Sequence, residues 1–223
     1  MRVVALDGPS GVGKSTVGRR VAAELGLAYL DTGAMYRAVG LAAKRAGISL
    51  PIANPRAVVA LAEKSHVSVT GSADGARTFL DGEDVSKEIR TPEISMYASA
   101  VSAVPGVRRR LAGMQRELAL TAGGVLEGRD IGTKVVPETP HKFFLTARPD
   151  VRARRRFLEL EARGSPQPFE KVLADMEARD RADSTREDSP LRHDDTYVVV
   201  DTSDRTVEEV VEAIVRHVRG GAG

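Results

Sequence analysis

One short segment near the start of the chain limits the folds open to this sequence more than any other. Residues 8–15, Gly-Pro-Ser-Gly-Val-Gly-Lys-Ser, match the pattern G-x-x-x-x-G-K-[ST] at every fixed position. The segment follows Arg2–Leu6, an apolar and β-branched run that predicts a buried strand. It precedes Lys14–Leu25, whose apolar residues have helical spacing. A strand, a glycine-rich loop and a helix in this order predict a loop that cradles a phosphate group.

The chemistry of a bound phosphate explains each fixed residue of this loop. Glycines let consecutive backbone N–H groups converge on one anion, and the helix that follows directs its positive end at the same anion. Lys14 supplies a point charge for the β- and γ-phosphate oxygens, and Ser15 offers a hydroxyl ligand to Mg²⁺. The residues predicted to bind the nucleotide are Gly8, Pro9, Ser10, Gly11, Val12, Gly13, Lys14, Ser15 and Thr16. The loop alone distinguishes neither ATP from GTP nor one phosphoryl acceptor from another.

The rest of the chain predicts an α/β fold. Strands are expected at 2–6, 28–30, 125–126, 143–146 and 197–200. Helices are expected at 14–25, 34–45, 151–163 and 169–181, with two more after the Thr91-Pro92 start signal and a last one after a capping box formed by Thr206 and Glu209. Strands that alternate with helices indicate a mostly parallel sheet covered on both faces.

A second, smaller sheet is expected as an insertion. Val67–Thr70 and Thr78–Leu80 have strand character, and Asp81-Gly82 is a strong signal for a tight turn. An antiparallel sheet at about residues 65–86 fits badly into a parallel sheet. We therefore interpret it as an insertion into the α/β domain.

Composition argues against several classes of protein. The 33 basic and 31 acidic residues leave a formal net charge of only +2, and there are four tyrosines, five phenylalanines and no tryptophan. Neither the charge nor the aromatic content favours nucleic-acid binding. The absence of cysteine excludes disulfides and thiolate metal sites. The chain has no apolar run near 18 residues and too short an apolar start for a signal peptide, so we expect a cytoplasmic protein that does not enter a membrane.

Residues 31–37, Asp-Thr-Gly-Ala-Met-Tyr-Arg, place charge at the end of the second predicted strand. Ligands collect at this end of the strands in open α/β sheets. Thr32 is expected to cap the helix that follows, and Arg37, about one turn inside it, to hold the phosphate of an acceptor. An ordinary cap with an exposed arginine would explain the same segment.

Two later segments have the same character. Residues 127–132, Glu-Gly-Arg-Asp-Ile-Gly, follow another predicted strand. Residues 179–186 end a helix on which Arg179, Asp183 and Arg186 share a face. Taken singly, the first could be a turn with a local salt bridge and the second a solvated charged face.

The glycine loop and residues 31–37, 128–132 and 179–186 together, in this order and spacing, strongly resemble the bacterial cytidylate kinase family. The resemblance extends from Leu6 to the last helix. It implies a three-layer fold of the P-loop NTP hydrolase type, with a mostly parallel five-stranded sheet, that uses ATP and Mg²⁺ to phosphorylate CMP and dCMP to CDP and dCDP. It also implies that the chain has three regions: a CORE domain at 1–34, 98–150 and 185–223, an NMP-binding region at 35–97 and a helical lid at 151–184. Nothing in the sequence demands a partner chain, so a monomer is expected.

The resemblance assigns roles to individual residues. The predicted substrate-binding residues are Thr32, Arg37, Ser99, Arg108, Arg129, Asp130, Arg179, Asp183 and Arg186. In this scheme Arg37, Arg129 and Arg186 hold the acceptor phosphate and, with Lys14, offset the repulsion between two anions during catalysis. Arg179 and Asp183 hold the ribose hydroxyls. Of the lid arginines Arg152, Arg154, Arg155 and Arg156, the prediction assigns Arg155 to ATP.

Ser99, Arg108 and Asp130 would read cytosine. The Asp130 carboxylate can accept a hydrogen bond from the N4 amino group, and Arg108 can donate to the ring acceptors. Uracil has a carbonyl in place of the amino group, which would leave Asp130 unmatched, so the site should disfavour UMP. Glu127 stands where relatives often have Asp, and Lys134 stands where an apolar residue is expected, but neither falls on a predicted contact position.

Three alternatives stay open on the sequence. The chain could be another small-molecule kinase that acts on UMP, GMP or a metabolite. It could be a GTP-dependent switch, although the guanine motif N-K-x-D is absent from the sequence. The arginine clusters at 108–110 and 152–156 would also suit a nucleic-acid-binding ATPase. The nearly balanced charge of the chain argues against this alternative.

Overall fold

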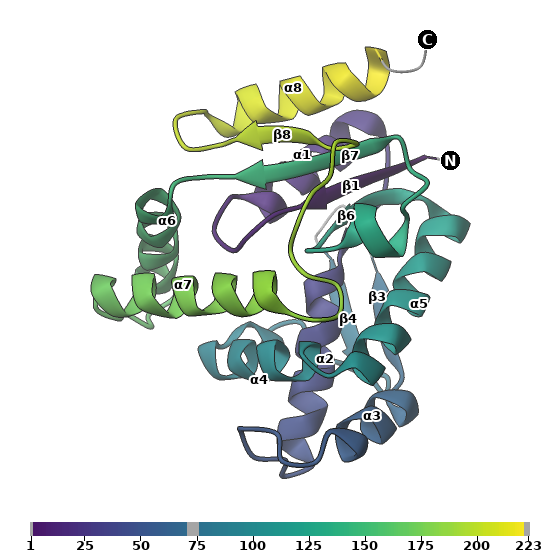
Figure 1. The fold of residues 1–223 in the computed structure, drawn as a ribbon, viewed down its shortest axis with the longest axis vertical. Coiled ribbons are helices and arrows are strands. Elements are labelled where there is room, and N and C mark those ends of the chain that lie inside the picture. Colours follow the sequence, from purple (N-terminus) through teal and green to yellow (C-terminus); the bar gives the residue numbers. More distant parts are fainter. Residues whose placement is uncertain (1, 71–75, 221–223) are drawn as a thin grey trace.

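The computed structural model describes residues 2–70 and 76–220 (Figure 1). Its main sheet has five strands in the order β2-β6-β1-β7-β8, and every neighbouring pair is parallel. The strands are β1 Val3–Asp7, β2 Tyr29–Asp31, β6 Gly124–Glu127, β7 His141–Thr146 and β8 Val198–Asp201. The expected five-stranded parallel α/β sheet is confirmed.

Helices cover both faces of this sheet, as the alternation of side chains along β1 requires. Val4 and Leu6 point into a cluster with helices α1 (Lys14–Leu25) and α8 (Val207–Gly220). Val3 and Ala5 point into a second cluster, built with helix α5 (Pro105–Ala122) and the π-helical turn η2 (Ile131–Val135). The result is a three-layer domain whose parallel strands all end at the same edge.

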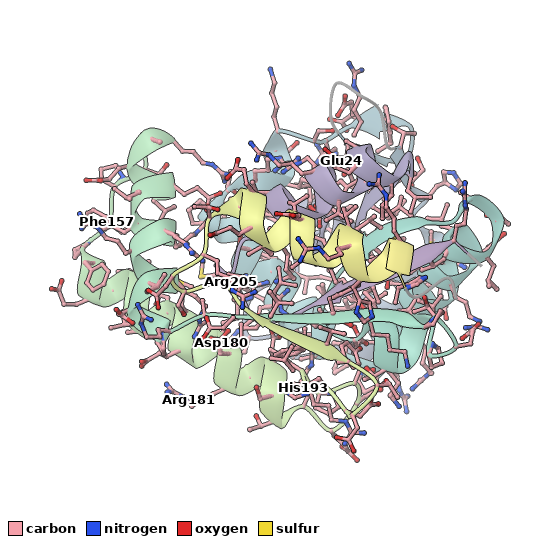
Figure 2. The ribbon with its side chains drawn as sticks, turned by 90° about the horizontal axis from the view of Figure 1, so that it is seen from above. Glu24, Phe157, Asp180, Arg181, His193 and Arg205 are labelled. Atoms are coloured by element: carbon pink, nitrogen blue, oxygen red, sulfur yellow. The ribbon has the colours of Figure 1, made fainter. Side chains whose placement is uncertain are left out.

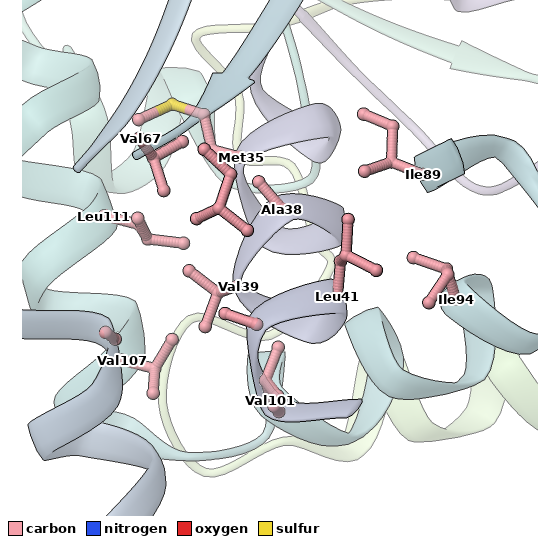
Figure 3. Close-up of a cluster of buried hydrophobic side chains, with 14 of the residues drawn as sticks. Met35, Ala38, Val39, Leu41, Val67, Ile89, Ile94, Val101, Val107 and Leu111 are labelled. Carbon is pink, nitrogen blue, oxygen red and sulfur yellow. The ribbon is translucent and has the colours of Figure 1, made fainter. Parts of the chain in front are cut away.

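Below the sheet in Figure 1, a separate hydrophobic cluster surrounds helix α2 (Thr32–Arg45). Figure 3 shows Met35, Val39 and Leu41 of this helix packed among residues from the surrounding elements. These elements are α3 Pro55–Lys64, β3 Val67–Thr70, β4 Arg77–Leu80, β5 Glu83–Asp84, the 3-10 helix η1 Glu88–Arg90, α4 Pro92–Ser102 and the first part of α5.

The small antiparallel sheet is confirmed, with strand order β3-β4-β5. Asp81 and Gly82 form its turn with φ angles of 52° and 88°. Positive φ at both central positions matches the twist of an antiparallel pair, which is why Asp-Gly suits this turn. Residues 71–75 of the predicted insertion lie outside the described part of the chain.

Helix α6 (Pro149–Ala162) stands at the left of the sheet in Figure 1, and helix α7 (Phe169–Thr185) lies below the sheet. They pack on each other through a small cluster of their own, formed by Ala153, Leu160, Val172 and Met176. A unit with its own apolar contacts can move as one body. The residue limits of the core, NMP-binding and lid regions stay predictions, and residues 1 and 221–223 of those regions lie outside the described part.

Several local predictions can be compared with the structure. The Thr91 hydroxyl accepts from the Ile94 N–H at 3.2 Å, and Thr206 with Glu209 forms the expected capping box. Helix α3 was not predicted, although Asn54-Pro55 is a helix start in which the Asn54 side chain accepts from Ala57 N–H. Helix α7 extends to Thr185, four residues beyond the predicted end, because glycine and proline are absent from 182–185. Within 2–70 and 76–220, no helix combines the length and apolarity needed to cross a membrane.

Candidate active site

The glycine-rich loop leaves the positive end of helix α1 open. Gly13 precedes the helix with φ 90° and, as a glycine, has no side chain to cap the first turn, which itself holds no acidic residue. Neither the cap residue nor the first turn therefore competes with an anion for the first N–H groups. Gly8 is required by space as well as by its φ of 143°, because a Cβ atom there would lie 2.1 Å from the Leu145 carbonyl oxygen.

Lys14 lies at the centre of this loop with only 6% of its surface exposed. Its Nζ donates to the carbonyl oxygens of Gly8 at 2.8 Å and Pro9 at 2.6 Å. Burial lowers the pKa of Lys14, and the positive charge of Arg129 lowers it further. A buried cation in need of a counter-charge is suited to bind phosphate oxygens.

Glu127, at the end of β6, lies beside the phosphate loop. Its Oε1 accepts from the Ser15 hydroxyl at 2.9 Å, while its buried Oε2 has no hydrogen-bond partner among the described residues. Burial raises the pKa of Glu127, and the nearby Asp31 carboxylate adds to the rise. The contact between Glu127 and Ser15 was not predicted from the sequence. The available signal was its place at the end of a strand, since β6 pairs with β1 and brings Glu127 beside Leu6, two residues before the loop.

The start of α2 differs from the expectation in one detail. Asp31, not Thr32, caps the helix by accepting from Ala34 N–H at 3.1 Å. The helix begins two residues earlier than predicted, so the extended cap position falls on Asp31. The Thr32 hydroxyl donates instead to the Glu127 carbonyl oxygen at 2.7 Å. Arg37 lies one turn inside the helix as predicted, and its Nη2 is 2.5 Å from the second Asp31 carboxylate oxygen.

Asp183 of α7 joins two of the predicted phosphate-binding arginines. Its Oδ2 accepts from Arg129 Nε at 3.0 Å, and its Oδ1 accepts from Arg186 Nη1 at 3.2 Å. Burial alone would raise the pKa of Asp183, but the charges of Arg129, Arg179 and Arg186 outweigh it and hold the pKa below its usual value. Arg129 and Arg186, 57 positions apart in the sequence, thus meet on one carboxylate.

The cations of this region act on one another. Burial lowers the pKa of Arg179 to about 10, with further lowering by the charges of Arg129 and Arg37. Arg179 also lowers the pKa of Lys14. Lys14, Arg37 and Arg129, which follow β1, β2 and β6, thus lie near enough to Arg179 of α7 for their charges to interact, and Arg129 contacts this helix directly at Asp183. Such a concentration of like charge indicates a site for anions.

A buried ion pair joins two of the residues predicted to read a base. Arg108 of α5 is paired with Asp130, and its guanidinium lies 5.5 Å from the centre of the Tyr36 ring. Arg108 also donates to the Ser102 carbonyl oxygen at 3.4 Å. Ser99, one turn earlier in α4, is half-buried, and its carbonyl oxygen accepts from the Ser102 hydroxyl.

Two arginines of α6 are connected to the loop, one directly and one through another residue. Arg152 is buried, donates to the Ser10 carbonyl oxygen at 3.2 Å and pairs with Asp180 of α7. Arg155 donates to the backbone and side-chain oxygens of Thr202 at 2.6 and 3.0 Å, and the Thr202 hydroxyl reaches the Val12 carbonyl oxygen. Arg152 therefore touches the loop directly, whereas Arg155 reaches it through Thr202.

The chain is similar to known proteins over almost its whole length. The family model described as Cytidylate kinase matches residues 4–220. A cytidylate kinase of Mycolicibacterium paratuberculosis is 53% identical over 94% of this chain and 92% of its own length. Another, of Caldanaerobacter subterraneus subsp. tengcongensis, is 48% identical over 97% of this chain and 94% of its own length. This chain belongs to the cytidylate kinase family.

A solved structure supports the fold of this cytidylate kinase family member independently of close sequence similarity. An uncharacterized protein from Eubacterium ventriosum superposes with a TM-score of 0.53 at 12% identity, covering 99% of each chain. At this identity the likeness concerns the fold alone.

Replacing Arg152 by alanine is expected to raise the KM for ATP of this cytidylate kinase family member about tenfold. The change removes the contact to Ser10 and leaves Asp180 unpaired where α7 meets the loop. Arg154→Ala is the matched control, because Arg154 lies in the same helix but is exposed, with its guanidinium 5.5 Å from the centre of the Phe157 ring. Steady-state kinetics with ATP varied would measure both; an unchanged KM for ATP in the Arg152 variant would show that its contact with Ser10 has no part in ATP binding.

Proposed function

We propose that this chain transfers the γ-phosphoryl group of ATP to CMP and dCMP, giving ADP with CDP or dCDP. Membership of the cytidylate kinase family supports the reaction. The observation that carries the proposal for the site is the meeting of Arg129 and Arg186 on the Asp183 carboxylate, beside Arg179 and the buried Lys14. It indicates that cations from separate segments lie close together, as a reaction between two anions requires.

In the proposed complex, ATP occupies the loop formed by Gly8, Pro9, Ser10, Gly11, Val12, Gly13, Lys14, Ser15 and Thr16. The acceptor side comprises Thr32, Arg37, Ser99, Arg108, Arg129, Asp130, Arg179, Asp183 and Arg186. A phosphate oxygen of the acceptor attacks the γ-phosphorus in line, and the bond to the β-phosphate oxygen breaks. The attacking oxygen already carries negative charge, so no general base is needed, and Lys14, Arg37, Arg129 and Arg186 reduce the repulsion between the two phosphates.

The residues beside the loop fit a magnesium ion. Ser15 offers its hydroxyl, and the unpartnered, buried Oε2 of Glu127 is a hard anionic oxygen of the kind that Mg²⁺ prefers. We propose that these two side chains hold Mg²⁺ directly or through its water ligands. When bound, the ion would neutralise charge on the β- and γ-phosphate oxygens.

Residues 151–184 are proposed to act as a lid. Arg152 already ties this unit to the loop at Ser10, and Met176 of α7 lies against Gly11, where a Cβ atom would come within 2.8 Å of its side chain. Contacts from both lid helices to the loop support closure over ATP. Closure would exclude water and limit hydrolysis of ATP.

The identity of the acceptor is tested with a panel of nucleoside monophosphates and ATP. CMP and dCMP are expected to have the highest kcat/KM, with UMP lower by about tenfold or more because Asp130 would face a carbonyl. Asp130→Asn should reduce the ratio of the CMP to the UMP value, since an amide can also donate. The ratio is insensitive to any loss of folded enzyme caused by breaking the Arg108–Asp130 pair. Asp175→Asn, on the exposed surface of α7, is the matched control; a wild-type preference for UMP or GMP would overturn the cytosine assignment.

ATP is proposed as the donor in preference to GTP, and a comparison of the two in the same assay tests this. We also propose that the chain works as a monomer without nucleic-acid partners, because its formal net charge is only +2 and nothing in the sequence demands a partner chain. Light scattering across a range of concentrations and a titration with single-stranded nucleic acid test these two points.

A further inference from the structure

Asp7, the last residue of β1, is a buried carboxylate that the proposed chemistry does not use. None of its surface is exposed. Its Oδ1 accepts from the backbone N–H of Ile131 at 2.9 Å, and its Oδ2 accepts from that of Gly132 at 2.9 Å and from the Tyr197 hydroxyl at 2.8 Å. Three donors on two distant segments thus converge on one side chain.

The two backbone donors belong to the segment that carries the proposed acceptor residues. Ile131 and Gly132 begin the π-helical turn η2, directly after Arg129 and Asp130. Asp130 precedes this turn without capping it through its own side chain. Asp7 of β1 supplies the missing cap of η2. The Asp130 carboxylate is therefore available to pair with Arg108.

Gly132 leaves the space that the Tyr197 hydroxyl needs to reach Asp7. A Cβ atom on Gly132 would lie 2.5 Å from the Tyr197 hydroxyl oxygen, so only glycine lets Tyr197 reach Asp7 here. On the other side, the chain continues from Asp7 directly into Gly8 and the phosphate loop. Asp7 is therefore linked covalently to the first residue of the loop, and by hydrogen bonds to the segment that carries the proposed acceptor residues.

We propose that Asp7 is a positioning residue that fixes the distance between the two halves of the active site, by holding the Arg129–Asp130 segment against the strand that leads into the phosphate loop. This inference rests on the proposed function, in which that segment binds the acceptor nucleotide. The geometric demand is strict, because a displacement of about 1 Å of a bound reactant can lower the rate of a reaction about 10²-fold.

The groups around Asp7 act on its pKa in opposite directions. Burial raises the pKa of Asp7 to about 6; the two backbone donors lower the pKa, the charge of Asp130 raises it, and the Tyr197 hydroxyl lowers it. The negative charge of Asp7 in turn opposes the lowering of the pKa of Lys14. Lys142 faces the same region from β7, with its Nζ 5.9 Å from the centre of the Tyr197 ring.

The test is Asp7→Asn. An amide has one acceptor oxygen, so one of the two N–H groups of Ile131 and Gly132 would face the NH₂ group and lose its partner. The KM and the dissociation constant for CMP are expected to rise about tenfold or more, while the KM for ATP stays within about threefold, because the loop amides keep their own geometry. Isothermal titration with CMP in the absence of ATP separates acceptor binding from turnover.

Thr139→Val is the matched control for a loss that is only structural. The Thr139 hydroxyl donates to the Val3 carbonyl oxygen at 2.6 Å, a buried contact at the opposite end of the same strand. This variant should have a lower thermal midpoint with both KM values unchanged. If Asp7→Asn behaved in the same way, with a lower midpoint and an unchanged KM for CMP, the positioning role would be refuted. A wild-type enzyme that fails to phosphorylate CMP would instead refute the proposed function.

Discussion

Replacing Lys14 by alanine is expected to lower kcat by a factor on the order of 10³ or more. The Lys14 ammonium group is held at the mouth of the loop by the carbonyl oxygens of Gly8 and Pro9, beside the open end of α1. Alanine would leave the γ-phosphate oxygens without this charge while negative charge shifts between them. Steady-state assays with saturating ATP and CMP give the result directly. Lys44→Ala is the control, because Lys44 is exposed and pairs with Glu93 away from the site; a loss below about tenfold at Lys14 would contradict its role.

Lys14 is also expected to lower the free energy of unfolding, although it is proposed to act in catalysis. Because burial lowers the pKa of Lys14 from its ordinary 10.5, the folded state binds fewer protons than the unfolded state between the two pKa values. The resulting penalty is largest below the folded pKa and fades as the pH rises toward 10.5. Lys14→Met removes the charge with little change in volume. Its thermal midpoint should equal or exceed that of the wild type near pH 6, with a difference that shrinks as pH rises; a much lower midpoint at every pH would show that Lys14 stabilises the fold.

Replacing Arg186 by alanine is the second change with a large expected effect, again on the order of 10³ or more in kcat. Arg186 follows the last residue of α7, where it donates to Asp183 and, at 2.8 Å, to the Ser189 carbonyl oxygen. Its loss would remove one cation from the acceptor site and one of the two partners that orient Asp183. Arg186→Lys should have an intermediate rate, because lysine keeps the charge but lacks the planar pair of donors.

Arg181→Ala is the matched control for Arg186. Both arginines lie near the C-terminal end of α7, but Arg181 is exposed and Figure 2 shows it on the outer side of α7, with Asp180 toward the rest of the protein. The Arg181 variant should retain wild-type kcat and KM. Equal kinetic effects at the two positions would indicate that the charge of α7 matters in general, and the specific assignment of Arg186 to the acceptor phosphate would be abandoned.

Most helices and strands could be predicted from the sequence, because strand, turn and cap signals each depend on a few neighbouring residues. The strand–loop–helix unit at the start, the Asp81-Gly82 turn and the caps at Thr91 and Thr206 all depend on short-range geometry, and each is present in the structure. Helix α3 was not predicted because it is short and buries only Val58 and Ala62, which is a weak helical pattern in the sequence. The cap of α2 was misplaced because Asp31 and Thr32 are adjacent and both can cap a helix.

The sequence named candidate residues for the site, but the contacts among them could not be predicted. The motifs named the glycine loop, Arg37, the Arg129-Asp130 pair and the end of α7, and the resemblance to cytidylate kinases named their roles. Ion pairs between remote segments have no signature in a single sequence. The arrangement of Arg129 and Arg186 on Asp183 became visible only in the folded chain.

By itself, the sequence determined that this protein has a parallel α/β sheet, a phosphate loop at its first strand and a family relationship, since each follows from the order of residues along the chain. Only the tertiary structure decided that Glu127 lies against Ser15, that Arg152 reaches Ser10, and that Asp7 holds the backbone of Ile131 and Gly132. The physical reason is that β1 pairs with β6 and β7, which brings together strand ends that are more than 100 residues apart. Buried polar groups at those ends must find partners across the sheet, and which partners they find depends on packing in three dimensions.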